Sequence, residues 1–435
     1  MQQARDSQGR DGGRLRVLVV GAGFGGLTLT RRLRAAPVQV TLLDQNNYHL
    51  FTPLLYQVAT ALLDPSEIAH PVRGILRGQG NARFRMGRLL AVHAAEHRVE
   101  TSIGDIAYDR LVLAAGSVNN TFGNPSIEEH AFPLKELGDA LALRNHVLAA
   151  FERAATTADP QQRRRFETIA VVGAGPTGVE CSGAFSELSR LVLRRDYAGE
   201  PLDRIDTELL EAAPSLLGSF APSLQRAAKR TLERKGVQVR LSTPVKELKG
   251  SGTLVLGDGA TVEAATVVWT AGVKASPAGE LLGVALDRGG RVPVDEWMRV
   301  VGVSDVYAIG DMAAVRGVGG PHPMLAPPAI QQGEHVARQL TAEATGQPGP
   351  GPFRYRDKGT MATIGRNSGI AQIGRLRFSG FIGWAMWLVV HLVQIIGFRN
   401  RLIVLINWAW DYVLFDRPVR LIAEAKRRNG DNQIP

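Results

Sequence analysis

The chain carries the same glycine pattern twice, and each copy follows an apolar run. Residues 21–26 read GAGFGG after the run 17–20, and residues 173–178 read GAGPTG after the run 169–172. In a Rossmann unit, the first glycine permits the turn, the second lets a pyrophosphate approach, and the third packs the helix on the strand. One copy is weak evidence, because glycine accounts for 48 of 435 residues. Two copies in the same context predict two dinucleotide sites.

A carboxylate ends the strand that follows each glycine pattern. Asp44 comes after residues 40–43, and Glu211 comes after residues 207–210. In a Rossmann unit, a carboxylate at this position accepts hydrogen bonds from ribose hydroxyls. No arginine adjoins Glu211 to pair with a 2′-phosphate, so the sequence favours NADH over NADPH at the second site.

The segments downstream of the two patterns echo each other. In each half, a small meander returns to a strand that stops at Ala-Gly, ending at Gly116 and at Gly272. A further strand, residues 306–309, delivers Asp311 at its carboxyl end, where ligands bind in open α/β sheets. These features resemble the two-dinucleotide flavoproteins related to glutathione reductase, whose first unit binds FAD and whose second binds NAD(P)H. The expected fold class is therefore α/β, with two Rossmann-like domains and a C-terminal amphipathic helical membrane anchor.

The order of these features predicts a split FAD-binding domain with the NADH-binding domain inserted into it. The segment rich in glycine and proline at residues 346–352 indicates a linker. A chain of this length can bury two full cores. The expected divisions are a disordered leader at 1–14, the FAD-binding domain at 15–123 and 273–345, the NADH-binding domain at 124–272, and the linker and membrane-anchoring region at 346–435.

The chain has a single cysteine, which excludes the dithiol relay that many such flavoproteins use. Relay and sulfide chemistry both need two or more sulfurs near the flavin. Electrons must therefore leave the flavin directly. Cys181 follows Glu180 in an apolar helix, which predicts a packing role.

The C-terminal region predicts a peripheral membrane anchor. Residues 381–398 are at the lower edge of spanning length, and Trp384, Trp387, His391 and Gln394 recur three or four apart. A second apolar run, 402–415, contains aromatic residues and is followed by cations. Rings at headgroup depth with flanking cations are typical of a monotopic anchor on an anionic leaflet, here on the cytoplasmic face of the cell membrane. The residues of this second group are Trp408, Trp410, Tyr412, Arg417, Arg420, Lys426, Arg427 and Arg428.

Two other structures for this region stay open, a core helix hairpin and a true membrane span. The net charge of +10 fits a membrane surface. It does not indicate nucleic acid, because no basic run interleaved with aromatic residues occurs outside the tail. Residues 1–14 are polar and do not form a secretory signal.

Four segments together resemble the type II NADH:quinone oxidoreductases, the single-subunit, non-pumping NADH dehydrogenases. They are residues 47–57 after Asp44, residues 132–135, residues 173–180, and residues 331–333 after Asp311. The resemblance runs from about residue 15 to residue 422. It implies oxidation of NADH by FAD and two-electron transfer to a membrane quinone without proton pumping.

The resemblance also implies the residues that contact the cofactors. The implied FAD contacts are Gly21, Gly23, Phe24, Gly25, Gly26, Asp44, Gln45, His49, Leu89 through its backbone, Gly116, Asp311, Ala326 and Pro327. The implied NADH contacts are Gly173, Gly175, Thr177, Gly178, Glu180, Glu211 and Gly272. For His49, a hydrogen bond within the fold is an equal alternative to a flavin contact. The histidines lack ligand spacing, so no metal site is expected.

Two residues are expected to act in catalysis. In the family, the glutamate that matches Glu180 positions nicotinamide or assists proton delivery to quinone, although a carboxylate there can also serve the helix dipole. The family's quinone-side signature, A-Q-x-A-x-Q, reads here from Ala326 to Gln331 with proline in place of the first glutamine. Gln331 is the expected hydrogen-bond donor to flavin or quinone.

Two other functions stay open. One is a reductase of the same fold with a soluble acceptor, ferredoxin or oxygen. The other is a non-catalytic redox sensor that binds NADH and FAD. A homodimer is also left open.

Overall fold

The computed structural model describes residues 13–200, 202, 206–250, 252–315, 322–414 and 419–422. Residues 1–12 of the expected leader lie outside this range. Of the expected tail cations, Arg417, Lys426, Arg427 and Arg428 also lie outside it.

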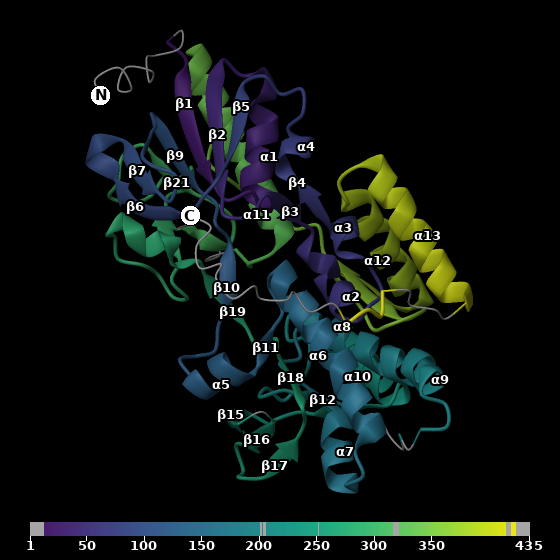
Figure 1. Ribbon diagram of the computed structural model, residues 1–435. Coiled ribbons are helices and arrows are strands. Elements are labelled where there is room, and N and C mark those ends of the chain that lie inside the picture. Colours follow the sequence, from purple (N-terminus) through teal and green to yellow (C-terminus); the bar gives the residue numbers. More distant parts are fainter. Residues whose placement is uncertain are drawn as a thin grey trace.

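The first unit is built on a five-stranded parallel sheet in the order β21-β9-β1-β2-β5. Its inner strands are runs of buried valine and leucine, the pattern of a sheet covered on both faces. β21 comes last of these five strands in the sequence, and it lies at one edge of the sheet, beside β9 (Figure 1). The bounds are β1 (Leu15–Val20), β2 (Val38–Asp44), β5 (Ala82–Met86), β9 (Arg110–Leu113) and β21 (Val306–Ala308).

The second unit repeats this arrangement in the order β11-β18-β12-β13-β14. In both sheets, the strand before the glycine pattern lies between the strand that ends in the carboxylate and the strand that ends at Ala-Gly. The echo in the sequence therefore reflects a repeated topology. The bounds are β11 (Phe132–Pro133), β12 (Thr168–Val172), β13 (Asp206–Leu210), β14 (Val237–Arg240) and β18 (Thr266–Trp269).

Each unit carries a three-stranded antiparallel meander, and a two-stranded ribbon joins the units (Figure 1). In the ribbon, β10 (Ser117–Asn119) pairs with β19 (Val273–Ala275), so the chain leaves the first unit and returns to it side by side. The meanders are β6 (Leu89–His93), β7 (Arg98–Thr101) and β8 (Ile106–Ala107) in the first unit, and β15 (Val245–Lys249), β16 (Thr253–Leu256) and β17 (Thr261–Glu263) in the second.

Helices α1 (Phe24–Arg32) and α11 (Ala326–Thr345) pack together at glycine positions. A Cβ on Gly333 would lie 2.5 Å from the carbonyl oxygen of Gly25. Side chains at these two positions would force the helices apart. The close approach holds the beginning of α11 near the first glycine loop.

The C-terminal region forms a small sheet and two helices that pack on both units. The antiparallel strands β23 (Thr360–Thr363), β24 (Gly369–Ile373) and β25 (Leu376–Gly380) lead into α12 (Phe381–Gln394) and α13 (Phe398–Leu414). Trp387 is 1% exposed and Trp408 is 2% exposed, and both belong to the core shared with α2 (Leu55–Ala59) and α8 (Pro176–Glu187). The prediction that these two rings lie at headgroup depth is therefore wrong. Each indole N–H finds a buried acceptor instead.

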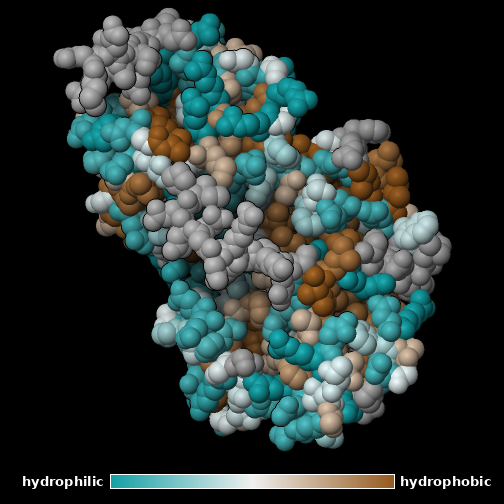
Figure 2. Space-filling model, in the orientation of Figure 1, coloured by the Kyte–Doolittle hydropathy of each residue, from teal (hydrophilic) through white to brown (hydrophobic). Residues whose placement is uncertain are grey.

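The outer face of the two helices is apolar, with aliphatic side chains and the rings of Phe381 and Trp410. Figure 2 shows brown, apolar surface over the α12 and α13 region at the right of the view. Within the described residues, no helix has the length and apolar character that a membrane span needs. The exposed apolar side chains are Phe381, Ile382, Val389 and Val393 on α12, and Leu402, Leu405, Ile406 and Trp410 on α13.

Candidate active site

The first glycine loop, between β1 and α1, has the shape that a pyrophosphate requires. Gly21 has φ +107°, and a Cβ there would lie 2.3 Å from the carbonyl oxygen of Ala114, so only glycine fits. A Cβ on Gly26 would lie 1.9 Å from the carbonyl oxygen of Gly21. A Cβ on Gly23, in contrast, would meet no atom within 4 Å. The loop is thus closely packed on the sheet and open at its second glycine, at the N-terminus of α1.

The side chains of Asp44 and His49 form hydrogen bonds with the backbone of this loop. Asp44 accepts the backbone N–H of Ala22 at 2.6 Å and that of Asn46 at 2.7 Å, and burial raises its pKa. His49 donates from Nδ1 to the carbonyl oxygen of Ala22 at 2.8 Å. Burial lowers the pKa of His49 to about 4, so the ring is neutral at pH 7. The alternative of a hydrogen bond within the fold therefore applies to Nδ1 of His49, while a flavin contact of the ring stays a prediction.

Asp311 lies beside the start of the ribbon and takes part in a chain of polar contacts between the two units. Lys135 donates from Nζ to Ser117 Oγ at 2.7 Å, and Ser117 donates to Asp311 Oδ2 at 2.5 Å. Lys135 belongs to the segment 132–135 that carries the resemblance, but its side chain was not expected to reach Asp311. Contacts between residues that lie far apart in the sequence leave no pattern in the local sequence that could predict them.

The second glycine loop, between β12 and α8, reproduces the first. Gly173 has φ +101°, and a Cβ there would lie 2.5 Å from Cα of Ala271. A Cβ on Gly178 would lie 1.8 Å from the carbonyl oxygen of Gly173, whereas a Cβ on Gly175 would meet no atom within 4 Å. Thr177 is exposed in the first turn of α8. The two loops therefore offer the same open space to a phosphate.

Glu211 holds the second loop as Asp44 holds the first. It accepts the backbone N–H of Ala174 at 2.6 Å and that of Ala213 at 2.8 Å. The arginine on the neighbouring strand, Arg240, pairs with Glu208 at 3.2 Å. Its charge is thus engaged away from the position that a 2′-phosphate would occupy beside Glu211.

Glu180 is the buried acid of the site. It lies on α8 and is 8% exposed. Its Oε1 accepts the backbone N–H of Thr363 at 3.2 Å and the indole N–H of Trp387 at 3.1 Å. Burial raises its pKa to about 8 against these two hydrogen bonds, so the group is a neutral carboxylic acid at pH 7. The contact with Trp387 was missed, because the sequence pattern placed that ring at a membrane surface.

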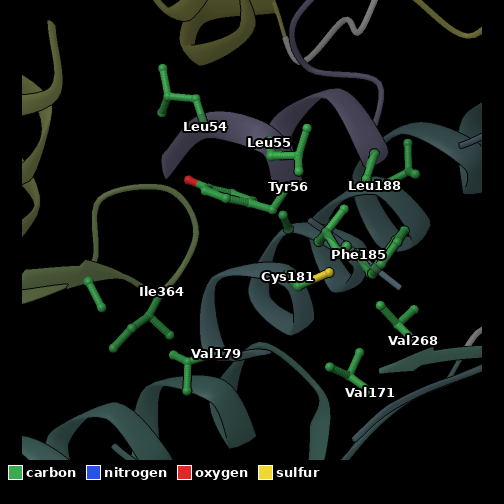
Figure 3. Packing of buried hydrophobic residues seen from close by; sticks show 14 of the residues in the cluster. Leu54, Leu55, Tyr56, Val171, Val179, Cys181, Phe185, Leu188, Val268 and Ile364 are labelled. Carbon is green, nitrogen blue, oxygen red and sulfur yellow. The ribbon is translucent and has the colours of Figure 1, made fainter. Parts of the chain in front are cut away.

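The neighbour of Glu180 is inert. Figure 3 shows the Cys181 sulfur among apolar side chains of α8, α2 and the second sheet. Cys181 is fully buried, and burial raises the pKa of its thiol. The predicted packing role is confirmed.

A row of rings joins the first loop to the acid on α8. Phe24, in the first loop, contacts Phe51 at 5.8 Å between ring centroids, and Phe51 contacts His391 at 6.3 Å. His391 stacks on Trp387 at 4.1 Å, and Trp387 donates to Glu180. Through these contacts, the C-terminal helix α12 reaches both Phe51, which packs on the first loop, and the acid on α8.

The quinone-side segment forms the first turns of α11. Pro327 and Pro328 fit there, because the first N–H groups of a helix have no partner within the helix. Gln331 is turned to the Arg356 backbone, donating to its carbonyl at 2.9 Å and accepting its N–H at 3.0 Å. Gln332 is fully buried and accepts the N–H of Gly310 at 2.6 Å. These two hydrogen bonds hold the Gln331 amide at Arg356, and its role as a donor to flavin or quinone stays a prediction.

The other expected contacts lie around the first loop and at strand ends. Gly116 has φ +70° and space around it, and Gly272 has φ +156°. Gln45 is exposed directly after β2. Leu89 begins β6, and Ala326 begins α11. The residues present thus fit FAD on the first unit and NADH on the second.

Most of the chain matches two known families. Residues 15–333 match the pyridine nucleotide-disulphide oxidoreductase family, and residues 358–417 match the NDH2 C-terminal domain. The chain is 40% identical over 409 residues to a type II NADH:quinone oxidoreductase of Mycobacterium tuberculosis, covering 91% of this chain and 87% of that protein. It is 31% identical over 449 residues to an internal alternative NAD(P)H-ubiquinone oxidoreductase of Arabidopsis thaliana, covering 95% of this chain and 87% of that protein.

The fold is similar to a solved structure of NDH2 from Plasmodium falciparum in complex with NADH. The TM-score is 0.85 at 18% identity, over 94% of this chain and 100% of that one. The fold and the paired loops define a two-dinucleotide flavoprotein oxidoreductase, which binds FAD and NADH. Within that class, the chain belongs to the type II NADH:quinone oxidoreductases.

Proposed function

We infer that the chain oxidises NADH and passes two electrons to a quinone at a membrane surface, without pumping protons. The observation that carries this function is the pair of matching loops, each open at its second glycine and held by a carboxylate. When bound, FAD supplies the two-electron chemistry. The residues of the chain bind and orient the nucleotides, exclude water and hold a proton.

Glu211 selects the nucleotide. Its carboxylate faces the position of the adenosine ribose in a Rossmann unit, where it favours two hydroxyls and repels a 2′-phosphate. The nearest cation on the adjacent strand, Arg240, already pairs with Glu208. NADH is therefore the preferred donor.

Glu180 holds the proton that quinone reduction consumes. A buried carboxylic acid with a pKa of about 8 is protonated at neutral pH and lies close enough to that pH to release its proton. Its position on α8, seven residues after the first glycine of the second loop, supports a place near the nicotinamide. The second N–H of the Gln331 amide is the donor we assign to flavin or quinone.

The outer face of α12 and α13 attaches the enzyme to the membrane. Ile382, Val389 and Val393 are each about 60% exposed, which is costly in water and favourable in the acyl boundary. Arg375 and Arg377 are exposed on the strand hairpin that leads into α12 and offer positive charge to anionic headgroups. This face, rather than the buried tryptophans, is the monotopic anchor, and we place it on the cytoplasmic leaflet.

Purified protein separates this function from the two alternatives. We expect steady NADH oxidation that a short-chain quinone accelerates under anaerobic conditions. Acceleration only by ferredoxin or oxygen would favour the soluble-acceptor reductase, and absence of turnover with all acceptors would favour the redox sensor.

A further inference from the structure

Among the described residues, Trp387 is the one whose side chain donates a hydrogen bond to Glu180. The indole Nε1 lies 3.1 Å from Glu180 Oε1, and the donor belongs to α12, the helix with the exposed apolar face. The second donor is the backbone N–H of Thr363 on β23, at 3.2 Å. The acid on α8 is therefore held from outside its own unit, by the C-terminal region alone.

The position of the Trp387 ring is fixed by its neighbours. His391 stacks on it at 4.1 Å with an interplanar angle of 23°, and His391 Nδ1 donates to the Trp387 carbonyl oxygen at 2.7 Å. The ring centroid of Trp408 lies 5.9 Å from that of Trp387, and that of Tyr56 on α2 lies at 6.5 Å. An indole held in this way keeps its N–H directed at Glu180, so little freedom remains to be lost when the bond forms.

The described ionisable groups around α8 are neutral or paired with an opposite charge. The hydrogen bond from Trp387 is therefore the main contact through which a change in the structure could alter the charge of Glu180. Towards α12, burial lowers the pKa of His391 to about 4, so His391 is neutral at pH 7. On α8 itself, the thiol of Cys181 is also neutral. Farther along the helix, Glu187 pairs with Lys235 at 2.7 Å, and towards β13 and β14 Glu208 pairs with Arg240. The phenol oxygen of Tyr56, on α2, accepts from Gln57 at 2.8 Å.

We propose that Trp387 is a positioning residue, whose indole N–H holds Glu180 and thereby couples the seating of the membrane-facing helix α12 to the charge of the acid. A donor to a carboxylate stabilises the ionised form more than the neutral form. When α12 is seated, the acid can release its proton near neutral pH. When α12 moves away, Glu180 loses this donor and retains its proton to higher pH. This inference deepens the proposed function, because it concerns the same acid.

The test measures the ionisation of Glu180 directly in the FAD-loaded enzyme, without quinone. The carboxylic C=O stretching band of Glu180 is identified by its absence in Glu180→Gln and followed by infrared spectroscopy as the pH rises. Trp387→Phe keeps a ring to stack on His391, removes the N–H donor and reduces the ring volume, and the Trp408→Phe control makes the same change of volume. We expect its titration midpoint to lie about one pH unit above that of the wild type.

Trp408→Phe is the matched control. Trp408 is also buried, and its indole also donates one hydrogen bond, to Gln57 Oε1 at 2.9 Å, but it does not contact Glu180. We expect this variant to leave the midpoint unchanged. An unchanged midpoint in Trp387→Phe, or an equal shift in Trp408→Phe, would overturn the proposal.

A wild-type measurement covers the case in which Trp387→Phe does not fold. The indole N–H marker band in ultraviolet resonance Raman spectra reports the strength of the hydrogen bond, and Trp387 should contribute a component that weakens as Glu180 becomes protonated. We expect this component to titrate with the midpoint of the infrared band and to be absent in Glu180→Gln. A marker band that does not change with pH would contradict the proposal. Because neither readout involves quinone, failure here is distinct from failure of the quinone reductase assay.

Discussion

Asn407 on α13 donates its amide N–H to the Glu67 carboxylate on the short helix α3 (Pro65–Ile68). The other oxygen, Oε2, is buried and has no hydrogen-bond partner among the described residues. Burial raises the pKa of Glu67 to about 7. Burial therefore stabilises the folded chain when this acid is neutral, and it outweighs the hydrogen bond from Asn407, which favours the ionised form.

Glu67→Gln should make the protein more stable at pH 8 relative to the wild type than at pH 5. In the wild type, the stability present below the unfolded pKa of 4.5 is lost as the pH rises through the folded pKa of about 7. The glutamine cannot ionise. We therefore expect the free energy of unfolding of Glu67→Gln, relative to that of the wild type, to be roughly 1–3 kcal/mol higher at pH 8 than at pH 5. Thermal unfolding at the two pH values measures it. Glu129→Gln, at an exposed acid, should show no such difference.

Gly23→Val and Gly175→Val form a matched pair that separates the two dinucleotide sites. Gly23 has φ −70° and Gly175 has φ −69°, so valine strains neither backbone. Both side chains would enter the space left for a phosphate. We expect Gly23→Val to be purified without FAD. Gly175→Val should keep full flavin absorbance and raise KM for NADH by at least about tenfold. Normal flavin content in Gly23→Val would contradict the assignment of the first loop.

Glu211→Gln should weaken the preference for NADH. The amide keeps an oxygen for the N–H of Ala174 but removes the negative charge that repels a 2′-phosphate. We expect the ratio of kcat/KM for NADH to kcat/KM for NADPH to fall roughly tenfold. Steady-state assays with both nucleotides give the ratio. A wild-type ratio near one would remove the role of Glu211 in selection.

Replacing Ile382, Val389 and Val393 by glutamine should detach the protein from membranes without unfolding it. The three side chains point away from the core, and their burial in lipid is worth about 1.5–3 kcal/mol each. We expect partitioning to vesicles with acidic lipids to fall at least about a hundredfold by flotation, with FAD content unchanged. Glutamine at Met86, Leu90 and Ile103, also exposed but on the first unit, is the control. Equal flotation of both variants would refute the anchor face.

The repeated local features of the chain could be predicted from its sequence. Glycine is required where φ is positive or a Cβ would clash, as at Gly21 and Gly173, and that requirement leaves a signal within a few residues. The carboxylates Asp44 and Glu211 each come at the end of the strand that follows a glycine pattern. The bounds of the predicted domains and the cofactor roles of individual residues stay predictions.

The tertiary contacts could not be predicted. The three-to-four spacing of Trp387 and His391 marks a special face of α12, but the spacing is the same whether that face meets lipid or a protein core. The buried acceptors Glu180 and Gln57 decide the matter, and they lie far away in sequence. The same applies to Lys135, which reaches Asp311 through Ser117 across two units.

The edge strand β21 pairs with β9, although the whole second unit lies between them in the sequence. During synthesis, the first four strands of the first sheet emerge before the strand that completes it. The second sheet is built from one continuous stretch of chain, so it can form while the first still exposes an unpaired edge along β9. The inserted unit can therefore complete its sheet before the N-terminal unit completes its own. Until residues 306–308 have left the ribosome, β9 has no β21 to pair with.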